Sequence, residues 1–279
     1  MHLVMLKRFI NKLKKQPSSR KVAPDWRQVT GGPLKGHYLY LDPQATSWQL
    51  EMMTGEFDAF IYKALGSPEH FEGAIIWDIG AHIGYHTLCF SSLVGPSGKV
   101  ICFEPNHFNA ERLQQNLDEN RDLSRRVTLM TCALSNEDGQ APFVFNDMVD
   151  TGESSGSFLK DTLYSDRQVE FGGLIETTIS TFRADTLLTE NRVPLPNIIK
   201  IDVEGAERLV LEGSVSLLAK AKPILIMEIH NITMMFYVQN LLFQLGYEVH
   251  MLNEEDSSPS RCHIIAKPTD PHKSVVKQQ

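Results

Sequence analysis

The chain has 279 residues, of which 42% are hydrophobic and 22% charged, and its formal net charge is −7. These values are typical of one large globular domain and exclude a disordered or collagen-like chain. No run of about eighteen apolar residues occurs, which argues against a transmembrane helix. The acidic balance argues against nucleic acid as a partner, because proteins that bind nucleic acid usually present a basic face.

The four cysteines stand alone in apolar stretches, without a CxxC pair; they are Cys89, Cys102, Cys132 and Cys262. This pattern is typical of reduced thiols in a protein core. We therefore expect neither a disulfide framework nor a zinc knuckle. We also expect a cytoplasmic location.

Residues 1–24 form a segment of their own, made of a basic stretch and a linker. Residues 1–22 hold seven lysines and arginines and no acidic residue, and leucine and isoleucine recur there at helical spacing. A basic amphipathic helix can lie on an anionic membrane surface, so peripheral membrane contact is one hypothesis. A solvated helix that packs on the body of the protein is the other. Charges interrupt the apolar stretch, so the segment does not resemble a secretory signal.

Residues 25–72 are expected to form an N-terminal extension. An apolar run predicts a strand over residues 37–41. Apolar residues at helical spacing predict one helix over residues 47–65.

From residue 73 to residue 268, short apolar runs alternate with helical segments. The expected strands cover residues 74–79, 99–103, 127–131, 197–201, 223–229, 247–252 and 262–266, and the expected helices cover 85–93, 108–120, 206–212 and 233–245. Continuous apolar strands that alternate with helices indicate a doubly wound α/β fold with a mainly parallel sheet. The last two strands, joined by a turn-rich stretch, predict an antiparallel hairpin at the edge of this sheet.

Residues 146–173 interrupt this alternation, and a tail follows at residues 269–279. The interruption is rich in serine, glycine and aspartate and is too long for an ordinary connection. Insertions beside the carboxyl edge of a sheet are commonly substrate loops, and disorder is the alternative.

A glycine turn follows the first strand of the predicted sheet. Gly80 and Gly84 allow the backbone to approach a ligand closely, and amides of Ala81 and His82 at the start of the helix are expected to face it. Asp78 ends the strand and suits a ligand with an amine and a sulfonium better than a pyrophosphate, which a carboxylate repels. The spacing D-x-G-x-x-x-G also departs from the dinucleotide motif G-x-G-x-x-G, which disfavours a dehydrogenase. A tight turn without a ligand is the alternative.

An acidic residue ends the second strand, about twenty residues beyond the glycine turn. Glu104 is expected to accept both ribose hydroxyls of an adenosine, as the corresponding acid does in dinucleotide folds. Pro105 ends the strand, and Asn106 is expected to cap the next helix. The end of the third strand is expected to line the adenine pocket through the Ala133 backbone or the Ser135 hydroxyl.

A second acidic run follows the fourth strand. Asp202, Glu204 and Glu207 place three carboxylates within six residues. Such a group is costly unless it binds a cation, holds a proton or hydrogen-bonds a substrate. The next strand adds Glu228 and His230, whose side chains point to the same side. His230 is therefore a candidate general base or metal ligand beside Asp202 and Glu204, and a structural histidine is the alternative.

The sequence resembles the FkbM-type S-adenosylmethionine-dependent methyltransferases over roughly residues 40–252. The runs that carry the resemblance are DIGAHIGYHT (78–87), FEP (103–105), ALS (133–135), KIDVEGAE (200–207) and EIH (228–230). The resemblance implies the Rossmann-like class I methyltransferase sheet and S-adenosylmethionine as cofactor, with Asp202 among the residues that contact it. His82 stands where the family usually has asparagine, and Phe57-Asp58 stand where it usually has Tyr-Glu.

The resemblance also implies methyl transfer to a hydroxyl of a sugar, glycolipid, polysaccharide or polyketide-type metabolite. We expect in-line attack of the hydroxyl oxygen on the sulfonium methyl, with His230, supported by Glu204 or Asp202, taking the proton. A divalent cation held by the same three residues would serve by lowering the pKa of the alcohol. An N-methyltransferase that acts on a peptide or amine, and a non-catalytic module that binds S-adenosylmethionine or a nucleotide, are the alternatives. The expected partner is a small-molecule or carbohydrate acceptor, and a homo-oligomer is left open.

Overall fold

The computed structural model describes residues 24–41, 47–146, 156–160, 162, 174–252 and 262–269. The basic segment 1–22 and most of the 146–173 insertion and of the C-terminal tail lie outside the described residues, so the expectations for them stay predictions. Among the helices of the described part, none is long and apolar enough to cross a membrane.

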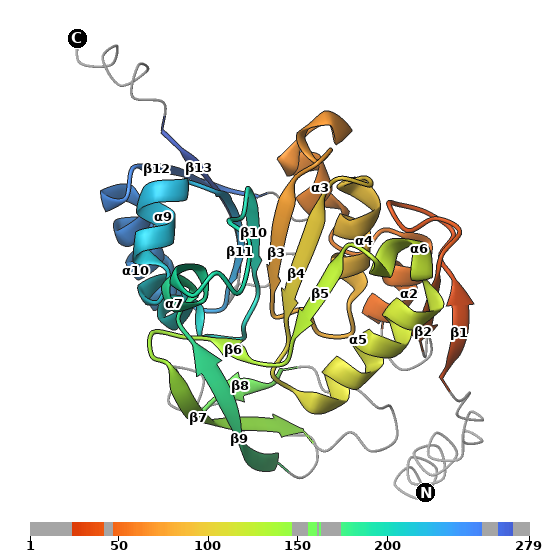
Figure 1. Ribbon diagram of the computed structural model, residues 1–279, viewed down its shortest axis with the longest axis horizontal. Helices are drawn as coiled ribbons and strands as arrows, with labels where there is room; N and C mark the ends of the chain where they lie inside the picture. The colour runs from red at the N-terminus through yellow and green to blue at the C-terminus, as the bar shows by residue number, and fades with distance from the viewer. Residues whose placement is uncertain are drawn as a thin grey trace, which may run out of the picture.

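A seven-stranded sheet forms the centre of the molecule (Figure 1). Its strands are β3 (Ile75–Ile79), β4 (Lys99–Phe103), β5 (Val127–Met130), β10 (Ile198–Ile201), β11 (Ile224–Ile229), β12 (Tyr247–Met251) and β13 (Cys262–Pro268). The spatial order is β12-β13-β11-β10-β3-β4-β5. The chain runs outward from β3 to β5 and then returns to β10 beside β3, so the carboxyl ends of β3 and β10 flank the switch point at which open α/β sheets bind ligands.

The predicted mainly parallel sheet with an antiparallel hairpin is confirmed. β3, β4, β5, β10 and β11 are parallel, whereas β13 is antiparallel to both β11 and β12. β13 lies between β11 and β12, so β12 is the strand at the edge.

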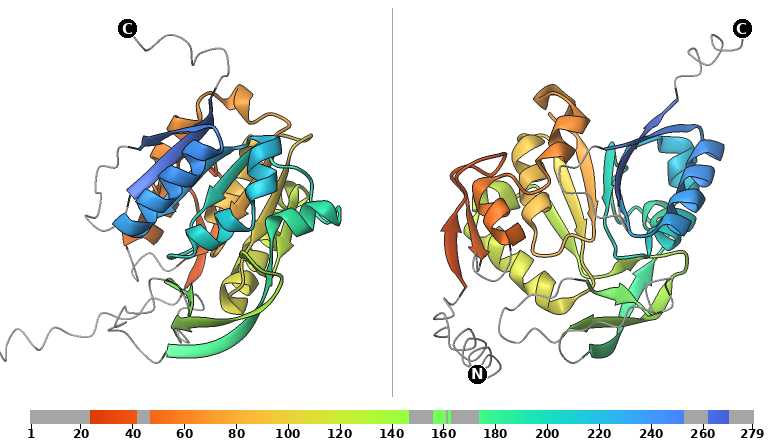
Figure 2. Two further views of the ribbon diagram at one scale, coloured as in Figure 1. Left: turned by 90° about the vertical axis from the view of Figure 1, so that its left-hand side faces the viewer. Right: turned by 180° about the vertical axis from the view of Figure 1, so that it is seen from behind.

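Helices cover both faces of this sheet (Figure 2). They are α4 (Tyr85–Leu93), α5 (His107–Glu119), α6 (Arg121–Ser124), α7 (Ala184–Thr189), α8 (Glu207–Glu212), α9 (Val215–Ala221) and α10 (Ile232–Gln244). The sequence pattern did not predict α6, α7 and α9. Alternate residues of β3 enter opposite cores. Trp77 packs in the cluster that includes α7 to α10, whereas Ile76 packs in the cluster that includes α4.

The N-terminal extension consists of β1 (Asp25–Gln28), β2 (Tyr38–Leu41), α2 (Ser47–Thr54), α3 (Ala59–Leu65) and a 3-10 turn η1 (Pro68–His70). The single helix predicted over residues 47–65 is wrong. Gly55 has a φ of 79°, and a Cβ there would overlap the backbone of Gly31. The helix therefore ends before Gly55, whose backbone packs directly against that of Gly31. The extension shares its core with the main sheet, and Tyr40 N donates to Asn116 Oδ1 of α5 at 2.8 Å.

A second sheet lies along the carboxyl edge of the central one, below it in Figure 1. Its strands are β6 (Ala133–Leu134), β7 (Gly139–Asn146), β8 (Phe158–Leu159) and β9 (Leu174–Phe182), in the order β6-β9-β7-β8. The sequence pattern did not predict this sheet, and β8 falls within the insertion. Phe143, Phe145 and Ile179 pack with Val203 and Ala206, which follow β10, so the second sheet covers the loops in which the predicted site residues lie.

Candidate active site

The two glycines of the turn allow close packing inside the protein. Gly80 and Gly84 have φ angles of 80° and 88°, values that favour glycine. A Cβ on Gly80 would overlap the backbone oxygen of Asp202, and a Cβ on Gly84 would lie 2.8 Å from Leu113 Cγ. The absence of a side chain at these two positions admits the end of β10 and helix α5, and the approach of a ligand to this backbone stays a prediction.

The backbone amides of the turn bind the end of β4. Gly80 N and Ala81 N both donate to the Phe103 carbonyl, at 3.0 and 3.1 Å, and His82 N donates to Glu104 Oε2 at 2.7 Å. The prediction that the Ala81 and His82 amides face a ligand is wrong in this structure. His82 contributes to the site through this amide, while its ring packs edge-on against Trp48 with the centroids 5.6 Å apart.

Asp78 is fully buried and is held by two side chains of the protein. Thr87 Oγ1 donates to Asp78 Oδ2 at 2.6 Å, and Lys200 Nζ lies 3.6 Å from Asp78 Oδ1. The cationic group near Asp78 is thus Lys200, to which the sequence interpretation gave no role. Lys200 and Asp78 are register partners across β10 and β3, and a lysine inside an otherwise apolar strand was the available signal.

Glu104 is buried at the end of β4, and its carboxylate accepts hydrogen bonds from two backbone amides. Besides His82 N, Asn106 N donates to Glu104 Oε1 at 2.9 Å. Burial raises the pKa of Glu104 to about 7, although these two hydrogen bonds act in the opposite direction. The predicted cap is confirmed, since Asn106 Oδ1 accepts a hydrogen bond from Phe108 N at 3.0 Å.

The two residues predicted beyond the third strand lie in different surroundings. Ala133, in β6, packs with the apolar cluster of the second sheet. Ser135 is buried, its amide donates to the Phe182 carbonyl at 2.9 Å, and a Cβ on Gly213 would overlap its carbonyl oxygen. These contacts tie Ser135 to β9 and to the turn before α9, so its role at an adenine pocket stays a prediction.

A cavity of about 570 Å³ opens next to Glu104, between α5, β5 and the second sheet. Pro105, Asn106 and Thr131 line it at the carboxyl ends of β4 and β5, and Phe143 and Ser180 line it on the second sheet. The cavity thus lies on the β5 side of the switch point. Its lining begins at Pro105, the residue that follows the predicted ribose-binding Glu104.

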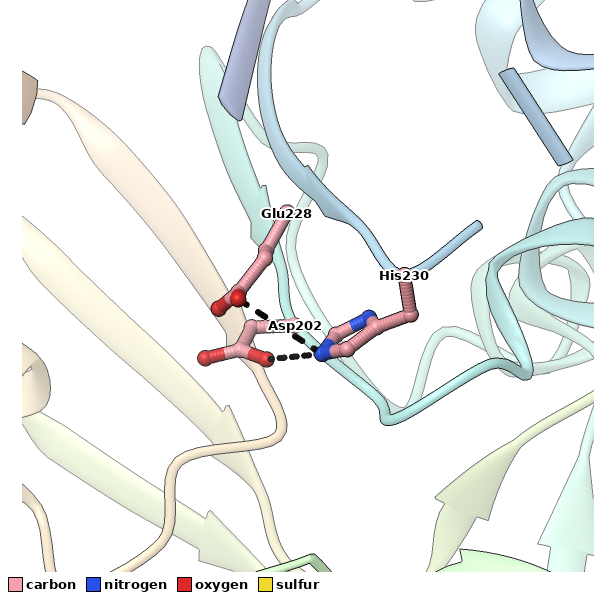
Figure 3. A group of neighbouring side chains, drawn as sticks. All are labelled: Asp202, Glu228 and His230. Atoms are coloured by element: carbon pink, nitrogen blue, oxygen red, sulfur yellow. Dashed lines mark ion pairs between the residues drawn. The ribbon is translucent and has the colours of Figure 1, made fainter. Parts of the chain in front are cut away.

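The carboxyl ends of β10 and β11 bring His230 together with three carboxylates, and Figure 3 shows two of them, Asp202 and Glu228. His230 Nε2 lies 3.8 Å from Asp202 Oδ1, 3.4 Å from Glu204 Oε2 and 3.7 Å from Glu228 Oε1. The predicted cluster of Asp202, Glu204 and His230 is confirmed as a spatial group. Glu204 has a φ of 50°, and such strain in a non-glycine residue is common at functional sites.

The other ring nitrogen of His230 is bound to Glu207. His230 Nδ1 lies 2.6 Å from Glu207 Oε1, which also accepts a hydrogen bond from Gly205 N at 3.0 Å. Burial alone would lower the pKa of His230, but the hydrogen bond with Glu207 and the charges of Glu204, Glu207 and Asp202 raise it to about 9. The raised pKa favours the protonated imidazole, whose Nε2 faces three carboxylates, and the role of His230 as general base stays a prediction.

The match to known proteins begins at the end of β3. The family model of the methyltransferase FkbM domain matches residues 78–249. The chain belongs to the FkbM family of S-adenosylmethionine-dependent methyltransferases. The matched residues include the glycine turn, Glu104 and the cluster around His230.

Relatives support the same family. The chain is 30% identical over 183 residues to the hexuronic acid methyltransferase AglP of Haloferax volcanii, a match that covers 66% of each protein. It is 27% identical over 177 residues to the methyltransferase sdnD of Sordaria araneosa, which covers 55% of this chain and 68% of that protein. The match thus spans just under two thirds of AglP.

A solved structure agrees with the fold. The FkbM methyltransferase of Methylobacillus flagellatus KT superposes with a TM-score of 0.50 at 15% identity, over 78% of this chain and 53% of that one. The predicted class I methyltransferase fold is confirmed by this likeness and by the order of the central strands.

Proposed function

We propose that the protein transfers a methyl group from S-adenosylmethionine to a hydroxyl of a sugar or a related metabolite. The observation that carries this proposal is the cluster of Asp202, Glu204 and His230 beside the glycine turn. A hydroxyl must lose its proton as it is methylated, whereas a neutral amine needs less help from a base. Several carboxylates at one strand end therefore suit an alcohol acceptor.

The residues at the switch point fit the cofactor. Glu104 would accept the ribose hydroxyls, because its carboxylate is held in place by the amides of His82 and Asn106. Asp202, whose carboxylate is partly exposed, offers negative charge toward a cationic sulfonium and amine. When bound, the cofactor supplies an electrophilic methyl, so that a C–O bond forms as the C–S bond breaks and the hydroxyl proton is left for the protein to accept.

Glu204 is the proton acceptor in this proposal. Its side chain is partly exposed, and it lies 3.4 Å from His230 Nε2. His230 cannot rotate away, because its Nδ1 is bound by the fully buried Glu207. The imidazole thereby positions Glu204 and stabilises its charged form until an acceptor hydroxyl donates to it.

The class of acceptor is supported by a relative. AglP is named a hexuronic acid methyltransferase. A hexuronic acid carries both hydroxyls and a carboxylate, so the product could in principle be an ether or an ester. The three carboxylates around His230 repel the carboxylate of a uronic acid, which favours a hydroxyl of the sugar as the attacking group.

The test is product analysis with purified protein, S-adenosylmethionine and a panel of uronic acids, neutral sugars, amines and peptides. A gain of one methylene in mass on a sugar, retained after mild alkali, is the expected result and identifies a methyl ether. Loss of the added mass in alkali would identify an ester, and methylation of the amines alone would contradict the proposal.

A further inference from the structure

The ends of β10 and β11 place three metal-ligating side chains around one point. Asp202, Glu228 and His230 each offer one donor atom, and these atoms lie within 4.8 Å of one another. Figure 3 shows the three side chains pointing toward each other from the two strand ends. Two ligands held at about 2.1 Å from one cation lie roughly 3 to 3.5 Å apart. The distances of 3.7 and 3.8 Å from His230 Nε2 to Glu228 and Asp202 need only small side-chain rotations to reach this spacing.

A buried carboxylate fixes the orientation of the histidine. Glu207 is fully buried, its Oε1 binds His230 Nδ1 at 2.6 Å, and Gly205 N holds the same oxygen. Histidines that ligate metals commonly bind a carboxylate through their second ring nitrogen, which sets the tautomer and the direction of the ligating nitrogen. Here that arrangement directs Nε2 toward the carboxylates of Asp202 and Glu228.

The charges around this point also favour a cation. Five carboxylates gather around the ends of β3, β10 and β11 and the start of α8: Asp78, Asp202, Glu204, Glu207 and Glu228. Lys200 is buried and lies near two of them, at 3.6 Å from Asp78 and 3.3 Å from Asp202. The donor oxygens of Asp202 and Glu228 lie within 4.8 Å of one another, so their charges repel, and a divalent cation would offset that repulsion.

We propose that Asp202, Glu228 and His230 bind one divalent first-row transition cation, of the Mn²⁺ type, at the carboxyl ends of β10 and β11. The two carboxylates suit a hard cation such as Mn²⁺, the imidazole favours a first-row transition metal over Mg²⁺ or Ca²⁺, and the site offers no thiolate for softer metals. The site differs from the set expected from the sequence, because Glu228 replaces Glu204 as a ligand. Coordination releases the Nε2 proton of His230 to solvent, so in the metal-bound protein the cation, in place of that N–H, lies beside Glu204, which can still take a proton.

The role of the cation in the reaction rests on the proposed function. An acceptor hydroxyl bound to the cation would have a lower pKa and would lose its proton to Glu204 more readily. Binding of the cation itself needs no cofactor and no acceptor. The two proposals can therefore fail separately.

The experiment is a titration of the full-length protein with Mn²⁺, after removal of metals with a chelator, followed by electron paramagnetic resonance of the free ion. We expect one Mn²⁺ per chain. Asp202→Asn and Glu228→Gln are each expected to weaken binding at least about tenfold, and Glu207→Gln by about 10- to 100-fold. The matched control is Glu248→Gln, which alters an exposed carboxylate 3.3 Å from His250 and should leave binding unchanged.

Circular dichroism of each variant checks that its fold is retained, and the wild-type titration gives an answer even if a variant unfolds. Failure of the wild-type protein to bind Mn²⁺ at millimolar concentration, or equal binding by wild type and a folded Glu228→Gln, would overturn the site. S-adenosylhomocysteine binding is measured in parallel. Cofactor binding without Mn²⁺ binding removes the metal site alone, whereas Mn²⁺ binding without cofactor binding removes the methyl-transfer proposal alone.

Discussion

Lys200 lies directly across from Asp78 in the β10–β3 pair, with Nζ 3.6 Å from Oδ1 and both side chains buried. The same Nζ lies 3.3 Å from Asp202 Oδ2. Burial alone would lower the pKa of Lys200, but the charges of Asp202 and Asp78 raise it above its ordinary value, so Lys200 is charged at neutral pH. One lysine thus joins the strand that precedes the glycine turn to the strand that precedes the acidic cluster.

Lys200→Met should destabilise the fold strongly. The substitution leaves Asp78 in the interior without its nearest cation, and loss of one partner of a buried ion pair costs about 3–5 kcal/mol. Urea denaturation gives the free energy of unfolding. The control is Lys160→Met, which removes an exposed lysine 2.7 Å from Glu176 and should cost no more than about 1 kcal/mol. Equal losses of unfolding free energy in the two variants would show that the buried Lys200–Asp78 pair contributes no more to stability than an exposed pair.

Gly80→Ala tests the contact between the glycine turn and β10. The added Cβ would overlap the Asp202 carbonyl oxygen, and the φ of 80° is strained for alanine, so we expect a loss of about 3 kcal/mol or more. Gly36→Ala is the matched control, because its φ is 93° and an added Cβ meets nothing within 4 Å. The control should lose only about 1 kcal/mol, for the backbone alone. Similar melting temperatures for the two variants would contradict the close packing.

The central sheet could be predicted from the sequence because β3, β4, β10 and β11 are mostly apolar runs with an acid at or just beyond their ends. Trp77 and Ile76 are both buried, on opposite faces, which is what such a run implies. Parallel strands carry their final residues to one edge, so Asp202 and His230 could be expected to meet.

Other features depend on contacts between distant segments. The second sheet was missed because β9 alternates buried and exposed residues over polar threonines, a pattern weaker than an apolar run. The break at Gly55 depends on its contact with Gly31, which no local pattern reveals. The burial of Glu207 against His230 could not be predicted, because it depends on how the ends of β10 and β11 meet in space. A glutamate at the start of a helix is ordinarily solvated.

Affinity for S-adenosylhomocysteine should depend on pH through Glu104. Its pKa of about 7 means that the folded protein keeps this proton to a higher pH than the unfolded chain does. Ribose hydroxyls donate to the ionised carboxylate, so affinity should rise as the pH increases through that pKa and then level off. The free energy of unfolding should fall as the pH rises from about 4.5 to about 7, because in this range Glu104 is ionised in the unfolded chain and still protonated in the folded protein.

Calorimetry from acidic to mildly alkaline pH measures this dependence, and proton release on binding can be read from buffers of different ionisation enthalpy. Glu104→Gln should bind more weakly and with little pH dependence. Asp118→Asn, which alters an exposed aspartate on α5, should behave as wild type does. An affinity that does not change with pH in the wild-type protein would remove Glu104 as the ribose acceptor.

Glu204→Gln and His230→Ala separate proton transfer from binding. Loss of a positioned proton acceptor costs about 10²–10⁴ in rate, so kcat of Glu204→Gln should fall by at least about a hundredfold while S-adenosylhomocysteine binding stays near that of wild type. His230→Ala should also lower kcat, because Glu204 loses the imidazole at 3.4 Å that positions it. His250→Ala, an exposed histidine near Glu248, is the matched control and should keep full activity. An unchanged rate in His230→Ala would remove His230 from the mechanism, and an unchanged rate in Glu204→Gln would move the proton to another group of the cluster.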